Sequence, residues 1–231
     1  MKTLGMIGGL GPESTIEYYR LLFDAYRARV TDGSAPPILI NSVDMNKGLR
    51  MVTAGDYDGL ADYLVSELKP LAAAGAKFAL ISANTPHIAF DQIRKSSPLP
   101  LISIIEATAS EAKRQRLKTL ALFGTRFTMQ GTFYAKVFDR EGIVLKVPAP
   151  DEQDYIHDKY MNELVKGDIR DSTREGLLRV VDRMIERKRI EGLILGGTEL
   201  PLIVKDLGDR KIALLDTTKI HVNAAIEEML A

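Results

Sequence analysis

The sequence contains no cysteine. This absence excludes disulfide bonds and any thiolate that binds a metal or acts in catalysis, and it favours a reducing, cytoplasmic environment. Histidine is scarce as well: His87, His157 and His221 lie far apart and lack the spacing of zinc ligands. We therefore predict a cytoplasmic protein without a metal site.

An excess of either charge is also absent. The 31 basic and 31 acidic residues give a formal net charge of zero, whereas nucleic-acid and anionic-membrane partners normally require a basic excess. No apolar run approaches the roughly 20 residues that a bilayer-spanning helix needs. Hydrophobic residues make up 45% of the 231 residues, which is typical of a soluble globular protein with a substantial core. We predict neither a nucleic-acid partner nor a membrane partner.

Short apolar runs alternate regularly with longer segments of helical period. This alternation is typical of α/β folds, in which helices cover both faces of parallel sheets. The predicted strands are 3–8, 37–43, 77–82, 100–104, 119–123, 143–147, 191–196 and 212–215. The predicted helices are 13–30, 56–74, 87–95, 106–115, 129–141, 152–166, 171–189 and 217–230.

The two halves of the chain are built alike. Residues 80–87 and 193–200 each resemble a buried strand that runs into a small polar loop, and each follows, at nearly the same distance, a strand that ends in glycine. We predict two pseudo-symmetric lobes, each a parallel, Rossmann-like sheet flanked by helices. The first lobe comprises 1–104 plus 212–231, and the second comprises 105–211.

Ligands of open α/β sheets bind beyond the carboxyl ends of the strands. This rule predicts an active-site cleft between the lobes, lined by the loops 8–15, 83–87, 124–129 and 197–200. The first loop opens a helix, so that backbone N–H groups near Gly9 and Leu10 can hold a carboxylate-sized anion, unless its glycines serve only the turn. It lacks the glycine spacing of nucleotide-binding loops.

The other three loops carry small hydrogen-bonding side chains that suit the carboxylate and ammonium groups of an amino acid. The residues are Asn84, Thr85, Thr125, Thr128 and Thr198. Asn and Thr are also good helix caps, and capping is compatible with ligand binding. Arg126 either reaches an anionic substrate or extends into solvent.

Four motifs occur in order along the chain: GGLGPEST from Gly8, NTPH from Asn84, GTRFTM from Gly124 and LGGTELPL from Leu195. Together they resemble the aspartate/glutamate racemase family over essentially the whole chain. The resemblance implies a cofactor-independent α/β enzyme of two domains, commonly a homodimer. It also implies a small-molecule substrate, an amino acid for which an acidic side chain is favoured.

In that family two cysteines face each other across the substrate, and one removes the α-proton while the other returns a proton to the opposite face. The resemblance places these cysteines at Ala83 and Gly197, where neither side chain can carry a proton. Three explanations stay open: the chain is a natural non-catalytic homologue, glycine has replaced a natural cysteine at 197, or another residue has taken over. Glu199 and His87 are weak candidates for the last role.

Family members that select acidic amino acids bind the side-chain carboxylate with basic residues. Lys47, Arg50 and Lys166 are candidates here, and a plain surface position is an equal alternative for each. The sequence thus predicts a racemase that works without pyridoxal phosphate and is inactive or very slow as written. The alternatives are a homologue that only binds an amino acid or dicarboxylate, and a lyase or decarboxylase with the same carbanion chemistry.

Overall fold

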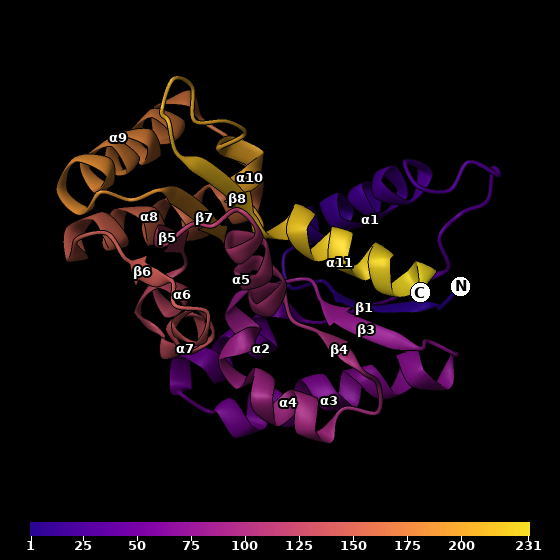
Figure 1. The fold of residues 1–231 in the computed structure, drawn as a ribbon. Helices are drawn as coiled ribbons and strands as arrows, with labels where there is room; N and C mark the ends of the chain where they lie inside the picture. The colour runs from indigo at the N-terminus through magenta and orange to yellow at the C-terminus, as the bar shows by residue number, and fades with distance from the viewer. The chain divides into compact units, whose positions relative to one another are not determined.

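The computed structural model describes residues 1–231, which divide into two compact units. The first unit comprises Met1–Ala107 and Thr218–Ala231, and the second comprises Thr108–Thr217. Each unit contains its own four-stranded sheet, in which all neighbouring strands are parallel (Figure 1). The predicted α/β fold with two parallel sheets flanked by helices is therefore confirmed.

The sheet of the first unit has the strand order β2-β1-β3-β4. Its strands are β1 (Leu4–Gly8), β2 (Ile38–Ser42), β3 (Phe78–Ile81) and β4 (Leu101–Ile102). The central strand β1 is fully buried and pairs with both β2 and β3, with Ile7 opposite Ile81. The loops that follow β1 and β3 therefore leave the same edge of the sheet side by side.

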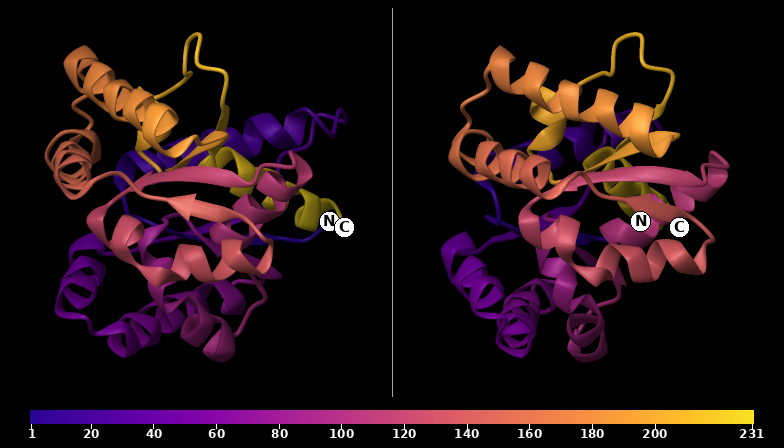
Figure 2. Two further views of the ribbon diagram at one scale, coloured as in Figure 1. Left: turned by 60° about the vertical axis from the view of Figure 1, so that its left-hand side comes forward. Right: turned by 90° about the vertical axis from the view of Figure 1, so that its left-hand side faces the viewer.

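Helices cover both faces of this first sheet. On one face α1 (Pro12–Arg27) and α11 (Thr217–Leu230) lie together, and on the other lie α3 (Tyr57–Ala73) and α4 (Phe90–Ser96) (Figure 1). The remaining helices of the unit are α2 (Met45–Ala54) and the 3₁₀ helix η1 (Thr85–Ala89). The chain ends lie side by side (Figure 2), because the Lys2 N–H donates to the carbonyl oxygen of Met229 at 2.8 Å.

Apolar side chains at helical spacing explain why α1 and α11 cover that face. Tyr18, Leu22 and Tyr26 recur at every fourth position of α1 and are fully buried. They form one core cluster with strand and α11 residues; its other fully buried members include Leu4, Met6, Leu80, Ala225, Ile226 and Met229. Burial of a large apolar side chain contributes about 1.5–3 kcal/mol, so this cluster fixes the helices against the sheet.

The sheet of the second unit has the strand order β6-β5-β7-β8. Its strands are β5 (Thr119–Gly124), β6 (Val144–Lys146), β7 (Gly192–Gly196) and β8 (Ala213–Asp216). Gly124 and Gly196 lie opposite each other at the carboxyl ends of β5 and β7. A Cβ atom on Gly124 would lie 2.6 Å from the carbonyl oxygen of Gly196, so the close approach of these strand ends requires glycine.

One face of the second sheet is covered by α8 (Pro150–Asn162), α9 (Asp171–Lys188) and α10 (Leu200–Ile203) (Figure 1). The other helices of the unit are α6 (Arg126–Gln130), α7 (Thr132–Arg140) and the 3₁₀ helix η2 (Leu164–Lys166). Helix α5 (Ile104–Arg114) contains the boundary between the two units. None of the helices is both long and apolar enough to cross a bilayer.

All eight predicted strands occur, but three features differ from the sequence predictions. Helices α2 and α10 were not predicted, and the predicted helix 129–141 is two helices because Gly131 adopts an extended conformation between them. The segment 212–231 does not return to the first half as a whole. Strand β8 pairs with β7 in the second sheet, and only α11 packs in the first unit, because its apolar face completes the cluster around α1.

Candidate functional site

The loop after β1 is shaped by glycines. Gly9 has a φ of +78°, and a Cβ there would lie 2.7 Å from the backbone nitrogen of Val43 and closer still to its carbonyl oxygen. The Gly9 N–H donates to Thr15 Oγ1 at 2.8 Å, so the loop itself uses one predicted anion-binding donor. Ser14 donates to the carbonyl oxygen of Ser82 at 3.0 Å and ties this loop to the end of β3.

The loop after β3 places Ala83 and Asn84 in buried positions, with Ala83 only 6% exposed. The Ser82 hydroxyl donates to the carbonyl oxygen of Ile7 at 2.8 Å, which holds the loop to β1. Asn84 precedes η1, which begins at Thr85. Residues 83–85 therefore lie just beyond the carboxyl end of β3, where the sequence predicted the loop.

His87 lies beneath this loop with both ring nitrogens in use. Nε2 accepts a hydrogen bond from the backbone N–H of Ile104 at 3.3 Å, so Nδ1 carries the proton and donates to the carbonyl oxygen of Ala83 at 3.0 Å. Burial, followed by the nearby His221, lowers the pKa of His87 to about 3. The ring is therefore neutral near pH 7, and its contacts favour support of the loop over proton transfer.

A second buried histidine stabilises the same unit, and sequence reasoning gave it no role. Tyr18 donates to Nδ1 of His221 at 2.8 Å, and Nε2 donates to the carbonyl oxygen of Ile102 at 3.0 Å. Burial lowers the pKa of His221 to about 4. The imidazole thus joins α1, β4 and α11 by hydrogen bonds while it stays uncharged.

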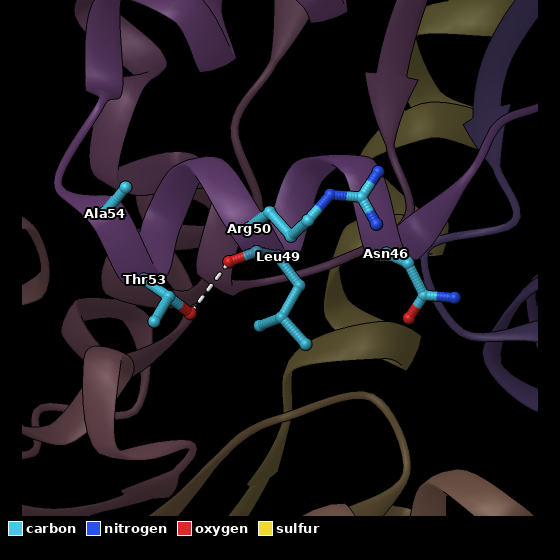
Figure 3. A pocket seen from close by; sticks show the side chains of 5 residues that line it. All are labelled: Asn46, Leu49, Arg50, Thr53 and Ala54. Atoms are coloured by element: carbon cyan, nitrogen blue, oxygen red, sulfur yellow. Dashed lines mark hydrogen bonds between the residues drawn. The ribbon is translucent and has the colours of Figure 1, made fainter.

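Two of the three predicted basic anchors lie on α2, and they differ in their surroundings. The Lys47 ammonium lies 4.1 Å from the centre of the Tyr63 ring, a cation–π contact. Arg50 lines a hollow of about 430 Å³ together with Asn46, Leu49, Thr53 and Ala54 (Figure 3). An exposed guanidinium at a hollow is suited to bind a carboxylate with two parallel hydrogen bonds.

The third predicted anchor is placed in the second unit. Lys166 ends η2 and is exposed. Its neighbour Glu163 is buried, and it accepts hydrogen bonds from Lys159 at 2.6 Å and from Thr173. These two hydrogen bonds, with that from Lys159 the larger, lower the pKa of the Glu163 carboxyl group. Glu163 therefore fixes the turn from which Lys166 projects.

The loop after β5 is held by its threonines. Thr125 caps α6, because its Oγ1 accepts the Thr128 N–H at 3.3 Å, and the two hydroxyls lie 3.2 Å apart. Arg126 forms an exposed ion pair with Asp154 at 2.8 Å. Capping, one of the two roles that the sequence left open, is thus observed at Thr125, and Arg126 is engaged at the surface by an acidic side chain.

The loop after β7 carries a buried carboxylate. Glu199 is 2% exposed and accepts hydrogen bonds from the hydroxyls of Thr198, at 3.0 Å, and Tyr160. Burial, and then the charge of Glu199, raise the pKa of Tyr160 well above its ordinary value. Tyr160 was missed by sequence reasoning, although its place on the buried face of α8, four residues after Ile156, was a signal.

The loops and strands described above fall within one recognised sequence family. The family described as Asp/Glu/hydantoin racemase matches residues 7–225, a range that covers all four loops and every strand except the start of β1. The chain belongs to the Asp/Glu/hydantoin racemase family. The resemblance that the four motifs indicated is therefore confirmed.

Two curated relatives illustrate this racemase family. The broad specificity amino-acid racemase RacX of Bacillus subtilis (strain 168) is 26% identical over 146 residues, which is 60% of this chain and 61% of RacX. A glutamate racemase of Fusobacterium nucleatum subsp. nucleatum is 28% identical over 159 residues, 66% of this chain and 57% of that protein. The alignments thus span about three fifths of these curated relatives.

A solved structure matches at full length. An aspartate racemase homologue from Pyrococcus horikoshii OT3 is 32% identical, with a TM-score of 0.86 and coverage of 100% of both chains. The likeness to this solved structure therefore extends over both units of the chain.

Proposed function

We propose that this chain is an amino-acid racemase of the aspartate/glutamate type whose turnover is very slow or absent. A racemase without pyridoxal phosphate needs a proton-transferring group on each face of the α-carbon. The family resemblance puts Ala83 and Gly197 at the two cysteine positions, and neither side chain can take up or release a proton. The observation that carries the proposal is this pair of residues within a family match that spans residues 7–225.

The size of the loss follows from general acid–base catalysis. A positioned acid or base contributes about 10²- to 10⁴-fold to a rate, and here both groups are missing. A thiol suits the task because its pKa lies close to neutrality and is lowered by nearby N–H donors. Of the two weak substitutes, Glu199 is the better placed, because both nitrogens of His87 are bound to the backbone.

An acidic amino acid is the substrate class that we propose. The names of two relatives, a glutamate racemase and an aspartate racemase homologue, support it. The Arg50 side chain at its hollow on α2 offers a bidentate partner for a second carboxylate. We further propose that the chain needs no cofactor, forms a homodimer and works in the cytoplasm, as the family resemblance implies.

The alternative is a homologue that binds an amino acid or dicarboxylate without chemistry. The specific observation that favours it is again the pair Ala83 and Gly197, because the loss of both thiols removes catalysis and leaves the polar loops in place. Binding without exchange of the α-proton is what this alternative predicts.

Deuterium exchange separates the two functions. We would incubate the chain with L- and D-aspartate and L- and D-glutamate in D₂O, follow deuterium at Cα by NMR, and measure binding by calorimetry. Binding with slow exchange supports the racemase. Binding without any exchange fits both a fully silenced racemase and the non-catalytic homologue, and exchange that appears once the thiols are restored then identifies the silenced racemase. Exchange at rates typical of enzymes, about 1–10³ per second, would contradict the proposed impairment, and no binding to any of the four would contradict the substrate class.

Arg50 tests the substrate class directly. We expect Arg50→Ala to weaken the binding of aspartate and glutamate by about tenfold or more, because a charged hydrogen bond contributes about 1.5–3 kcal/mol. The matched control is Arg187→Ala, at an arginine in the last turn of α9. If both variants weaken binding equally, or if neither weakens it, Arg50 is not part of the binding site.

A further inference from the structure

The position of the second family cysteine is filled by another side chain. A Cβ atom built on Gly197 would lie 3.0 Å from both Cζ and Oη of Tyr160 and closer still to Cε2. Real Cβ atoms do not come this close to other heavy atoms, so residue 197 can gain a side chain only if Tyr160 moves. Gly197 is not among the glycines with positive φ. Packing, not backbone conformation, therefore demands glycine here.

Tyr160 is firmly held in that place. Its ring belongs to the core cluster formed by α8, α9 and β7, and only 6% of the residue is exposed. Its hydroxyl donates to Glu199, which is itself buried. Rotation of the ring would open a cavity and would deprive a buried carboxylate of a donor, and both changes destabilise the folded state.

The hydroxyl of Tyr160 is poorly suited to replace the thiol as a base. Removal of its proton would put a phenolate beside the Glu199 carboxylate in a buried site, and two like charges at hydrogen-bond distance repel strongly. The raised pKa of Tyr160 has this same cause, after burial. The pair therefore keeps its proton on the tyrosine.

We propose that Tyr160 closes the second catalytic position: its ring occupies the volume of a residue-197 side chain, and Glu199 holds it there. Gly197 and Tyr160 then form a matched pair, and a thiol can act at 197 only if Tyr160 is also made smaller. The catalytic part of this inference rests on the proposed function, whereas the packing part does not.

The packing part is tested by thermal unfolding. We expect Gly197→Ala to lower Tm by roughly 2–10 °C, because overpacking of a core costs about 1–3 kcal/mol. The same loss should occur with Tyr160→Phe, which keeps the ring, and should vanish with Tyr160→Ala, which removes it. An equal loss of Tm from Gly197→Ala in all three backgrounds would overturn the proposal.

The catalytic part of the inference can be tested with thiol reagents, because the chain has no cysteine of its own. In Gly197→Cys the only thiol of the chain is at 197, so a thiol reagent reports on this site alone. We expect labelling at least tenfold faster in Gly197→Cys with Tyr160→Ala than in Gly197→Cys alone, and α-deuterium exchange of aspartate or glutamate only in the former. If the alanine variant unfolds, Tyr160→Leu retains an apolar side chain and replaces it.

Each result has a distinct meaning. Rapid labelling and exchange in Gly197→Cys alone would overturn the closure by Tyr160. Exchange by the unsubstituted chain that Tyr160→Phe removes would also overturn it, because the hydroxyl would then transfer protons. Faster thiol labelling of the double variant, without any α-deuterium exchange, would support the closure by Tyr160 and would count against the proposed racemase.

Discussion

Acid should destabilise this protein in a pH range set by its two buried histidines. In the folded state burial lowers the pKa of His87 to about 3 and that of His221 to about 4, from an ordinary value of 6.5. The unfolded chain therefore binds more protons than the folded one as the pH falls below about 6.5. Stability is complete above that pH and declines toward the folded pKa values.

The magnitude follows from the pKa difference. One pKa unit corresponds to about 1.4 kcal/mol, and pH 4.5 lies about two units below the pKa of an unfolded histidine. Each histidine thus stabilises the unfolded chain by about 2.5 kcal/mol at pH 4.5, and the two together by about 5 kcal/mol. Whole-protein stabilities are about 5–15 kcal/mol, so this loss is large.

Urea unfolding at pH 7.5, 6.5, 5.5 and 4.5, followed by circular dichroism, measures this loss. Carboxyl groups with a lowered pKa, such as Glu163 and Asp182, lose their contribution to the free energy of unfolding only below about pH 4.5. The chosen pH range therefore reports mainly on the histidines. His87→Gln and His221→Gln should each remove about half of the decline, because glutamine offers a donor and an acceptor and does not titrate.

The matched control is His157→Gln, at a half-buried histidine of the second unit. It should reduce the decline less than either buried histidine does. A free energy of unfolding that stays constant between pH 6.5 and 4.5 would refute the reasoning. So would a decline that both buried variants leave unchanged.

Two further substitutions test the supports of the loops. Gly9→Ala should lower the free energy of unfolding by about 2–4 kcal/mol, because it adds overlap with Val43 to the strain of a positive φ. Gly33→Ala shares the positive φ but meets open space, so it should cost only about 1 kcal/mol, and an equal cost for both would exclude the overlap. Glu163→Gln should cost about 1–3 kcal/mol in urea unfolding, because its charged hydrogen bonds with Lys159 and Thr173 are weakened. Glu175→Gln, at an exposed pair 3.7 Å from Arg179, should change stability by less than about 1 kcal/mol.

The strands could be predicted from sequence because each is a short apolar run that ends in small or polar residues. Phe78–Ile81 and Gly192–Gly196 are buried on both faces, and such strands lack polar alternation. Helix α2 escaped prediction although Asp44 caps its start and Gly55, with a φ of 72°, ends it. Gly48 weakens the apolar pattern of this helix in the sequence, although in the structure the glycine lies on the buried face of the helix.

The contacts of the candidate site were harder to predict, because they join residues far apart in the sequence. The loops were found from strand ends and family motifs, which are local. The tautomer of His87 depends on the N–H of Ile104, and the role of Tyr160 depends on the absence of a side chain at 197. Neither relation leaves a local pattern, so only the packed structure reveals them.

On the proposed assignment of the family cysteines to positions 83 and 197, the two substitutions are of different kinds. Ala83 retains a Cβ atom, and its carbonyl oxygen is held by His87, so the change there is the loss of one functional group from a supported loop. At Gly197 the side chain is absent altogether, and Tyr160 of α8 fills the place where a Cβ atom would lie. A deletion of one group is reversed by one substitution, whereas a repacked position requires two. Under the proposed function, this difference explains how the chain keeps the family fold and its polar loops while a return to thiol chemistry is blocked at one position.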